Sequence, residues 1–219
     1  MKNNNKTEQK LIDNAMRLFK RHGYANVTID QICDTVEISK NTFYYHFESK
    51  DSLLLAYMLE QKKATMQAIT DVLFAEKNHF EQFWVLQKKR IDILLDCGLD
   101  IVSHLRDMKT VHSAFSDEHE EDAMLEAKII GAAQADGSVR NQSDSRSLVA
   151  AAAMSFFGML MIWVSMKGAF DFELAMRFSY ENIFDVRPDL RRGSDLSDLY
   201  KHLVSAAQKD NKKGKNNAR

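Results

Sequence analysis

The pattern of apolar and polar positions predicts α-helices along most of the 219 residues. Apolar residues recur at intervals of three and four, the spacing that places them on one face of a helix. One proline and eight glycines are too few for a chain of short strands and tight turns. Helices are predicted at about 7–21, in two short segments within 28–47, and at about 49–75, 78–97, 99–113, 117–135, 145–168 and 171–184. We therefore expect an all-α protein.

Residues 28–50 form the most informative stretch. Thr28 followed three positions later by Gln31 is a capping-box pattern that marks the start of a helix. The helix is expected to bury one face, made of Ile29, Ile32, Cys33 and Val36. Ser39 is the N-cap candidate of the second helix, and Phe43 and Phe47, four apart, can anchor its underside. Two such helices predict a helix-turn-helix, in which the second helix enters the major groove of DNA.

The polar residues around this second helix are the candidate DNA contacts. Lys40, Asn41, Thr42 and Tyr44 are candidates for base edges: lysine suits guanine and asparagine suits adenine. The expected phosphate or sugar contacts are Thr28, Ser39, Tyr45, His46 and Lys50. Simpler roles stay open: Thr28 and Ser39 as caps only, Tyr44 as a core residue, and Lys50 as a solvated charge.

This part of the chain closely resembles the DNA-binding domain of the TetR family of bacterial transcriptional regulators. The resemblance rests on Phe19, Gly23-Tyr24, Thr28-Ile29, Ile32-Cys33, Ile38-Ser39-Lys40, Thr42-Phe43-Tyr44, Phe47, Ser49-Lys50-Asp51 and Leu53. Glu37 and Asn41 depart from it, since glycine is frequent at both positions in the family. Glycine tolerates a positive φ, so Glu37 suggests a slightly strained turn.

The resemblance implies a three-helix DNA-binding head, joined by a long helix to a helical body that binds an effector and dimerises. We expect the head at 1–50, the body at 51–186 and a C-terminal segment with a disordered basic tail at 187–219. It further implies a ligand-responsive regulator, expected to be a repressor released from a palindromic operator. A constitutive DNA-binding dimer without a small-molecule ligand is the alternative.

The effector pocket that the family implies has little local signature here. Large apolar residues with one polar handle could line it, and the region has no arginine cluster, so an apolar effector is favoured. The candidates are Phe83, Trp84, Ile101, His104, Leu105, Met108, Phe115, Met124 and Met159, although residues of this kind at helical spacing are more often plain core. Cys97 and His104 belong to no close-spaced set of ligands, so we expect no metal and no cofactor.

The two last long helices commonly form a four-helix bundle between subunits in the family, which implies a homodimer. The candidate interface residues are Phe157, Leu160, Met161, Val164, Phe172 and Phe178, with the monomer core as the alternative for each. Nineteen residues without a charge, 148–166, are also long enough to span a membrane. Their small residues suit close helix packing, so a buried helix is favoured.

Charge and composition narrow the remaining possibilities. The net charge is −1, and residues 1–50 hold eight Lys or Arg against six Asp or Glu, so any basic surface must be local. Two cysteines in predicted helices and the lack of a signal peptide favour a reducing cytoplasm. No nucleophile–base pair, phosphate-binding glycine loop or metal motif indicates an enzyme.

Overall fold

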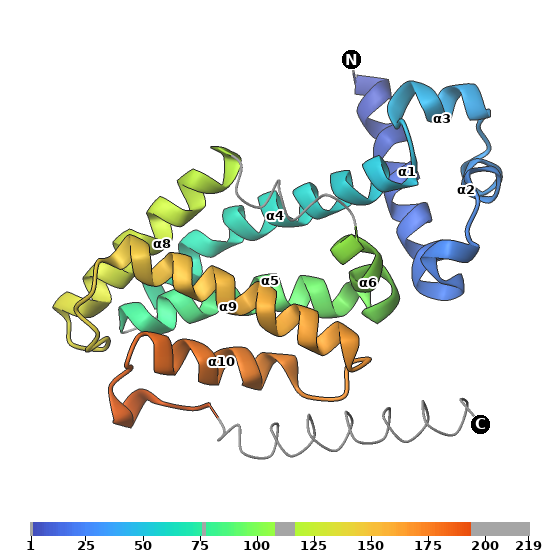
Figure 1. Cartoon of the computed structure of the whole chain (residues 1–219). Helices are drawn as coiled ribbons and strands as arrows, with labels where there is room; N and C mark the ends of the chain where they lie inside the picture. Colours follow the sequence, from blue (N-terminus) through green and yellow to red (C-terminus); the bar gives the residue numbers. More distant parts are fainter. Residues whose placement is uncertain (1, 76–77, 108–116, 194–219) are drawn as a thin grey trace, which may run out of the picture. The chain divides into compact units, whose positions relative to one another are not determined.

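The computed structural model describes residues 2–75, 78–107 and 117–193, and within these ranges the chain is helical without strands (Figure 1). By their contacts, the residues divide into two compact units. One unit comprises residues 1–71 and 92–108, and the other comprises 72–91 and 109–219. The predicted boundary at residue 50 stays a prediction, because the unit that holds the head continues to Asp71.

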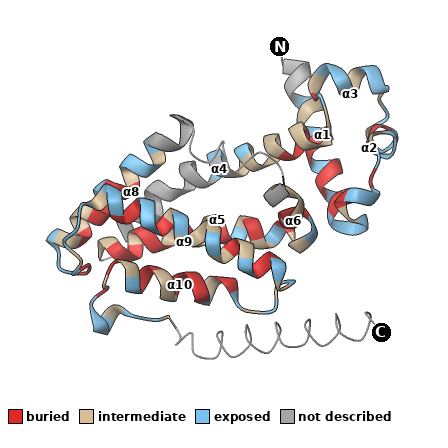
Figure 2. Ribbon diagram, viewed as in Figure 1, coloured by how far each residue is buried: buried red, intermediate tan, exposed pale blue. Residues whose placement is uncertain are grey.

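The first unit contains the three helices of the head, α1 (Lys2–His22), α2 (Ile29–Val36) and α3 (Lys40–His46). A 3₁₀ turn, η1 (Tyr24–Asn26), joins α1 to α2. The unit also includes most of α4 (Lys50–Ala75), the end of α5 (His79–Cys97) and α6 (Leu99–Asp107). The buried apolar residues of this unit, on segments drawn in red in Figure 2, include Leu11, Ile12, Phe19, Ile32, Phe43, Leu53 and Leu54.

The second unit packs α9 (Ser145–Ser165) against both α8 (Asp117–Ala135) and α10 (Phe172–Ile183). Its core is aromatic: Phe83 meets the rings of Tyr180 and Phe184 edge to face, at 5.5 and 5.0 Å between centroids. A second 3₁₀ turn, η2 (Pro188–Leu190), follows α10. Val139 and Val186 pair through an isolated antiparallel bridge.

A buried ion cluster in this unit fixes the segment after α10. Arg177 of α10 donates two hydrogen bonds to Glu81 of α5, at 2.6 and 2.9 Å, and one to Glu181, at 2.5 Å. Glu181 in turn accepts the backbone N–H groups of Arg192 and Gly193. Because each buried carboxylate has its donors, the cluster avoids the cost of an unpaired internal charge.

The predicted helices agree with the observed ones except at the start of α1, which begins at Lys2 rather than near residue 7, and at the end of α9. The Thr28–Gln31 capping box forms in both directions, and Ser39, Ser49 and Asp144 accept hydrogen bonds at the helix starts assigned to them. Helix α9 ends at Ser165 rather than near 168, because Lys167 and Gly168 both adopt a positive φ. The predicted helical residues 108–113 and the tail from 194 lie outside the described residues.

Of the described helices, α9 is the one whose length and apolar composition would suffice to cross a membrane. One third of its most apolar window, 33%, is buried within the chain. A core helix of a soluble protein has the same length and composition, so this finding is weak evidence for a membrane span.

Asp136, in the turn after α8, holds the start of α5. Its carboxylate accepts the backbone N–H of His79 at 3.1 Å, lies 2.6 Å from His79 Nδ1, and accepts the N–H of Ser138 at 2.8 Å. Burial alone would raise the pKa of Asp136, but the hydrogen bonds from Ser138 and His79 outweigh it and lower the pKa to about 2. The ionised carboxylate therefore stabilises the fold.

We predict that Asp136→Asn lowers the free energy of unfolding by about 1 kcal/mol at pH 7, less than the pKa difference alone would give, because solvent screens this exposed carboxylate. A lowered folded-state pKa contributes stability above the unfolded value near 4 and loses it as the pH falls toward 2. The difference from the wild type, measured by urea unfolding, should therefore shrink between pH 4 and pH 3. Asp34→Asn, at an exposed position of α2, is the control. A constant difference, or none at pH 7, would contradict this role.

Glu37, between α2 and α3, occupies the left-handed region with φ 60° and ψ 46°. The strained turn expected from the departure at this position is therefore confirmed. Such a conformation costs a non-glycine residue about 1–2 kcal/mol, and glycine avoids most of that cost.

We predict that Glu37→Gly raises the free energy of unfolding by about 0.5–1 kcal/mol, the relief of strain less the backbone entropy of glycine. Glu37→Ala is the matched control, since it removes the carboxylate but keeps the strained φ. Thermal unfolding should place the glycine variant above both other proteins. If the alanine variant is as stable as the glycine variant, the gain in stability comes from removing the carboxylate charge and not from relieving backbone strain.

Candidate nucleic-acid interface

Helix α3 is held in place by its buried underside. It spans only seven residues, and Ser39 Oγ caps it by accepting the backbone N–H of Thr42 at 3.2 Å. Phe43 is fully buried and Phe47 is 5% exposed, with their rings 6.1 Å apart. A helix this short is not stable alone in water, so its position depends on this packing.

The opposite face of α3 is polar and open to solvent (Figure 2). Tyr44 is 54% exposed and Tyr45 is 72% exposed, so the alternative that Tyr44 packs in the core is wrong. Asn41 is exposed as well, whereas Thr42 and His46 are half-buried. The exposed face therefore carries the amide of Asn41 and, one helical turn further on, the phenol groups of Tyr44 and Tyr45.

The N-terminus of α2 adds a second polar element to the head. The Thr28 hydroxyl accepts the backbone N–H of Gln31 at 3.3 Å, and the Gln31 side chain accepts the N–H of Thr28 at 2.8 Å. Thr28 is exposed, so its cap role is observed and its phosphate contact stays a prediction. The same holds for Ser39, which is an exposed cap.

The two lysines assigned to DNA are both engaged within the head. Lys40 pairs with Asp30 of α2 at 2.8 Å, with more than half of each side chain exposed, and such surface pairs are weak. Lys50 donates to the backbone carbonyls of Val27 and Tyr24, at 2.6 and 3.0 Å, and burial lowers the pKa of its ammonium. Its predicted phosphate contact would have to use the remaining N–H.

A polar cluster that the sequence did not reveal ties η1 to α4 and α6. The Tyr24 hydroxyl donates to Asp51, and His104 Nε2 lies 2.9 Å from the same carboxylate oxygen. The rings of Tyr24 and His104 stack at 3.9 Å, and Asp100 accepts the N–H of Tyr24 at 2.6 Å. Burial and the bond to Asp51 raise the pKa of Tyr24. No periodicity in the sequence indicates that these distant residues meet.

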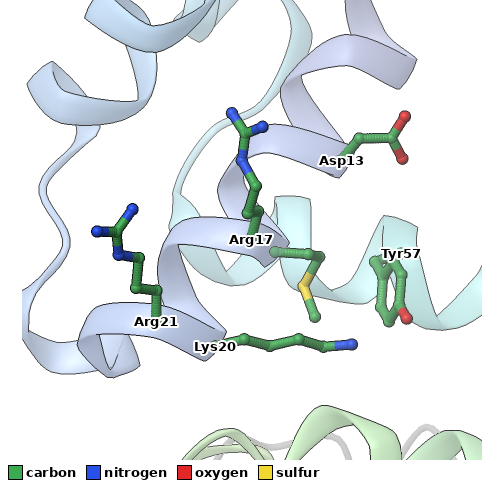
Figure 3. A pocket seen from close by; sticks show the side chains of 6 residues that line it. Asp13, Arg17, Lys20, Arg21 and Tyr57 are labelled. Atoms are coloured by element: carbon green, nitrogen blue, oxygen red, sulfur yellow. The ribbon is translucent and has the colours of Figure 1, made fainter.

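A basic hollow lies on α1 and α4, within the same unit. It measures about 450 Å³, is open to solvent, and is lined by Asp13, Met16, Arg17, Lys20, Arg21 and Tyr57 (Figure 3). Lys20 pairs with Asp96 at 2.6 Å, and Arg17 donates to Asn14 at the same distance. The head thus presents basic side chains on α1 as well as beside α3.

The candidate effector residues fall into both compact units. Ile101, His104 and Leu105 lie on α6 in the first unit, where His104 belongs to the Tyr24 cluster. In the second unit Phe83 is fully buried among aromatic rings, Trp84 is nearly buried and Met124 is 40% exposed. Met159 is half-buried, and Met108 and Phe115 lie outside the described residues. Among the side chains that the structure describes, no three metal-ligating groups gather.

The candidate dimer residues on α9 and α10 differ in exposure. Phe172 is 2% exposed and packs on Phe156 and Trp163, so within this chain it is a core residue. Leu160 and Val164 are also buried, whereas Phe157, Met161 and Phe178 are half-buried. The exposed large apolar residues of these two helices are Met154, Ile162 and Leu174, and none of them is among the predicted interface residues.

The N-terminal part of the chain is similar in sequence to known bacterial regulatory proteins. Residues 11–57 match the model of the bacterial regulatory proteins of the tetR family. A 46-residue stretch is 48% identical to the biofilm operon icaADBC HTH-type negative transcriptional regulator IcaR of Staphylococcus aureus. That stretch covers 21% of this chain and 25% of IcaR, about a quarter of the relative's length.

Other relatives match over more of the chain. The probable acrEF/envCD operon repressor of Escherichia coli is 25% identical over 182 residues, covering 76% of this chain and 80% of the relative. Thermus thermophilus FadR, a TetR-family repressor solved with lauroyl-CoA, has a TM-score of 0.62 at 18% identity. It aligns with 85% of this chain and over its own full length, 100%.

A transcriptional regulator from Saccharomonospora viridis, solved with choline, has a TM-score of 0.61 at 20% identity. The alignment covers 83% of this chain and 96% of that one, so the likeness in fold extends beyond the head. Together with the matched helix-turn-helix and its buried phenylalanines, these findings show that residues 11–57 form a DNA-binding domain of the tetR-family type.

Proposed function

We propose that this chain is a sequence-specific DNA-binding transcriptional regulator, a repressor that a small, largely apolar effector releases from a palindromic operator. The observation that carries the proposal is the exposed polar face of α3, fixed above the buried rings of Phe43 and Phe47. The two curated relatives described above are named as a negative regulator and a repressor, which supports repression over activation. The site of action would be the cytoplasm.

The proposed roles follow from what each exposed group can donate or accept. Asn41 has an amide that can bond adenine N6 and N7 together, and Lys40 can donate to guanine. Tyr44 and Thr42 would contact base edges, including a thymine methyl group. Tyr45, His46, Ser39, Thr28 and Lys50 would position the head on phosphates and sugars.

One seven-residue helix reads few base pairs, so specificity requires two heads on two half-sites. We propose that two chains associate through α9 and α10. Ala151, Met154, Gly158 and Ile162 of α9 are all exposed, and their spacing of three and four puts them on one face. An exposed apolar face of this kind is typical of an interface.

The proposed switch is a shift between head arrangements that the effector favours unequally. Ligand-bound relatives such as the choline complex and the lauroyl-CoA complex support effector binding in a body of this fold. A regulator that binds DNA constitutively is the alternative, and reproducible stabilisation by one class of compound would separate the two.

Selection of bound sequences from a random duplex pool tests the DNA-reading role. The wild type should enrich a palindrome, because two identical heads read two half-sites. Asn41→Ala should relax the preference at one position in each half-site, a loss of about 1–3 kcal/mol against the wrong base. Lys40→Ala should do the same at a guanine. Lys128→Ala, at an exposed position of α8, should leave the enriched sequence unchanged.

The absence of any enriched sequence at low salt, with dimeric and effector-free protein, would contradict the proposal. Enrichment of a palindrome that stays the same with Asn41→Ala and Lys40→Ala would instead remove these two residues from the reading surface.

Sedimentation tests the proposed dimer. The wild type should sediment at twice the chain mass of 25.2 kDa. Met154→Glu should shift it to the monomer, because a carboxylate at the centre of an apolar interface is buried without a partner. Met124→Glu places the same charge at an exposed methionine of α8 and should leave the dimer intact. A dimer unaffected by Met154→Glu would exclude this face of α9.

A further inference from the structure

The buried side chain of Gln87, on α5, has a hydrogen-bond donor without a partner. Gln87 is 5% exposed, and its amide nitrogen Nε2 has no partner among the described residues. Its oxygen Oε1 accepts from Arg90, with a long distance of 3.4 Å. Most buried polar side-chain atoms find a partner, so an unpaired donor calls for an explanation such as a ligand.

The surroundings of Gln87 come from three helices of one compact unit. Trp84 and Arg90 lie three residues before and after it on α5, and thus on the same face of the helix. Arg90 pairs with Glu126 of α8 and lies 3.6 Å from Asp122. Tyr180 of α10 meets the Trp84 ring edge to face at 6.4 Å. We call Trp84, Gln87, Arg90, Glu126 and Tyr180 the Gln87 cluster.

The charges of this cluster restrict the ligand that could reach the free donor. Arg90 is already matched by Glu126, and Asp122 adds a second carboxylate, so the local balance is negative. An anionic ligand is therefore disfavoured. The rings of Trp84 and Tyr180 pack against each other and are buried, so the inner side of the cluster is aromatic. The Arg90 side chain is 37% exposed, so the charged end of the cluster meets solvent.

We infer that Gln87 anchors the effector, donating its free N–H to the carbonyl oxygen of an uncharged, largely apolar compound. The inference rests on the proposed function only in assuming that an effector binds to the body. A carbonyl oxygen accepts the hydrogen bond that the protein leaves unmade, while the apolar remainder packs on the aromatic residues of the cluster. The inference therefore adds a carbonyl group to the apolar character already proposed for the effector.

Three probes of nearly equal apolar size test the inference by calorimetric titration and thermal shift. They are 4-phenyl-2-butanone, which has a carbonyl, butylbenzene, which has no acceptor, and 4-phenylbutyrate, which is an anion. The wild type should bind the ketone about tenfold more tightly than the hydrocarbon, since one satisfied hydrogen bond separates them. The carboxylate should bind least tightly.

Two variants identify the residue responsible. Gln87→Leu replaces the amide with an apolar side chain of similar size and so removes the free donor. The ketone and the hydrocarbon should then bind this variant equally tightly. Its thermal midpoint without ligand should be no lower than that of the wild type, because a buried unpaired donor is lost. Gln134→Leu is the matched control: its amide donates to the carbonyls of Asn141 and Ser143, so this variant should be less stable yet keep the ketone preference.

The inference is overturned if no probe binds at millimolar concentration, if the wild type does not prefer the ketone, or if Gln87→Leu retains the preference. Operator selection is carried out in parallel with the wild type and Gln87→Leu without probe. If the wild type enriches no palindrome, the proposed DNA-binding function is contradicted, but the inference about Gln87 is not. The inference about Gln87 is judged from the titrations with the three probes. The two failures are therefore distinguishable.

Discussion

The proposed DNA-reading surface depends on the burial of the Phe43 ring. Helix α3 has seven residues, fewer than a helix needs to persist in water without tertiary support. Phe43 is fully buried beneath it, and the Ser39 hydroxyl accepts the backbone N–H of Thr42. With the underside fixed, Asn41, Tyr44 and Tyr45 are presented in one orientation before any DNA is bound. Such preorganisation lowers the entropy cost of recognition.

The charges of the head indicate how that surface would read DNA. Lys40 pairs with Asp30, and Lys50 holds the loop before α2 through two carbonyls, so two cations near α3 already have partners. Amide and phenol groups dominate the exposed face of α3, which favours base reading over general attraction to phosphates. Arg17, Lys20 and Arg21 gather instead around the hollow on α1 and α4.

Much of this fold could be predicted from the sequence, because caps and helical periodicity are local. Thr28, Ser39 and Asp144 each begin a helix as their side chains predict. What could not be predicted are pairings between distant residues: Tyr24 with Asp51 and His104, and the commitment of Lys50 to backbone carbonyls. Nor does any sequence pattern show that the buried amide nitrogen of Gln87 has no partner among the described residues.

Hydrogen exchange of the full-length protein, with and without the selected palindrome, tests the central claim that α3 reads DNA. A scrambled duplex of equal length serves as the reference. The account predicts slower exchange over residues 28–47 with the palindrome and a much smaller effect with the scrambled duplex. Protection confined to residues 13–21 of α1 would show that the basic hollow and not α3 carries DNA binding, and equal protection of residues 28–47 by both duplexes would contradict sequence-specific reading.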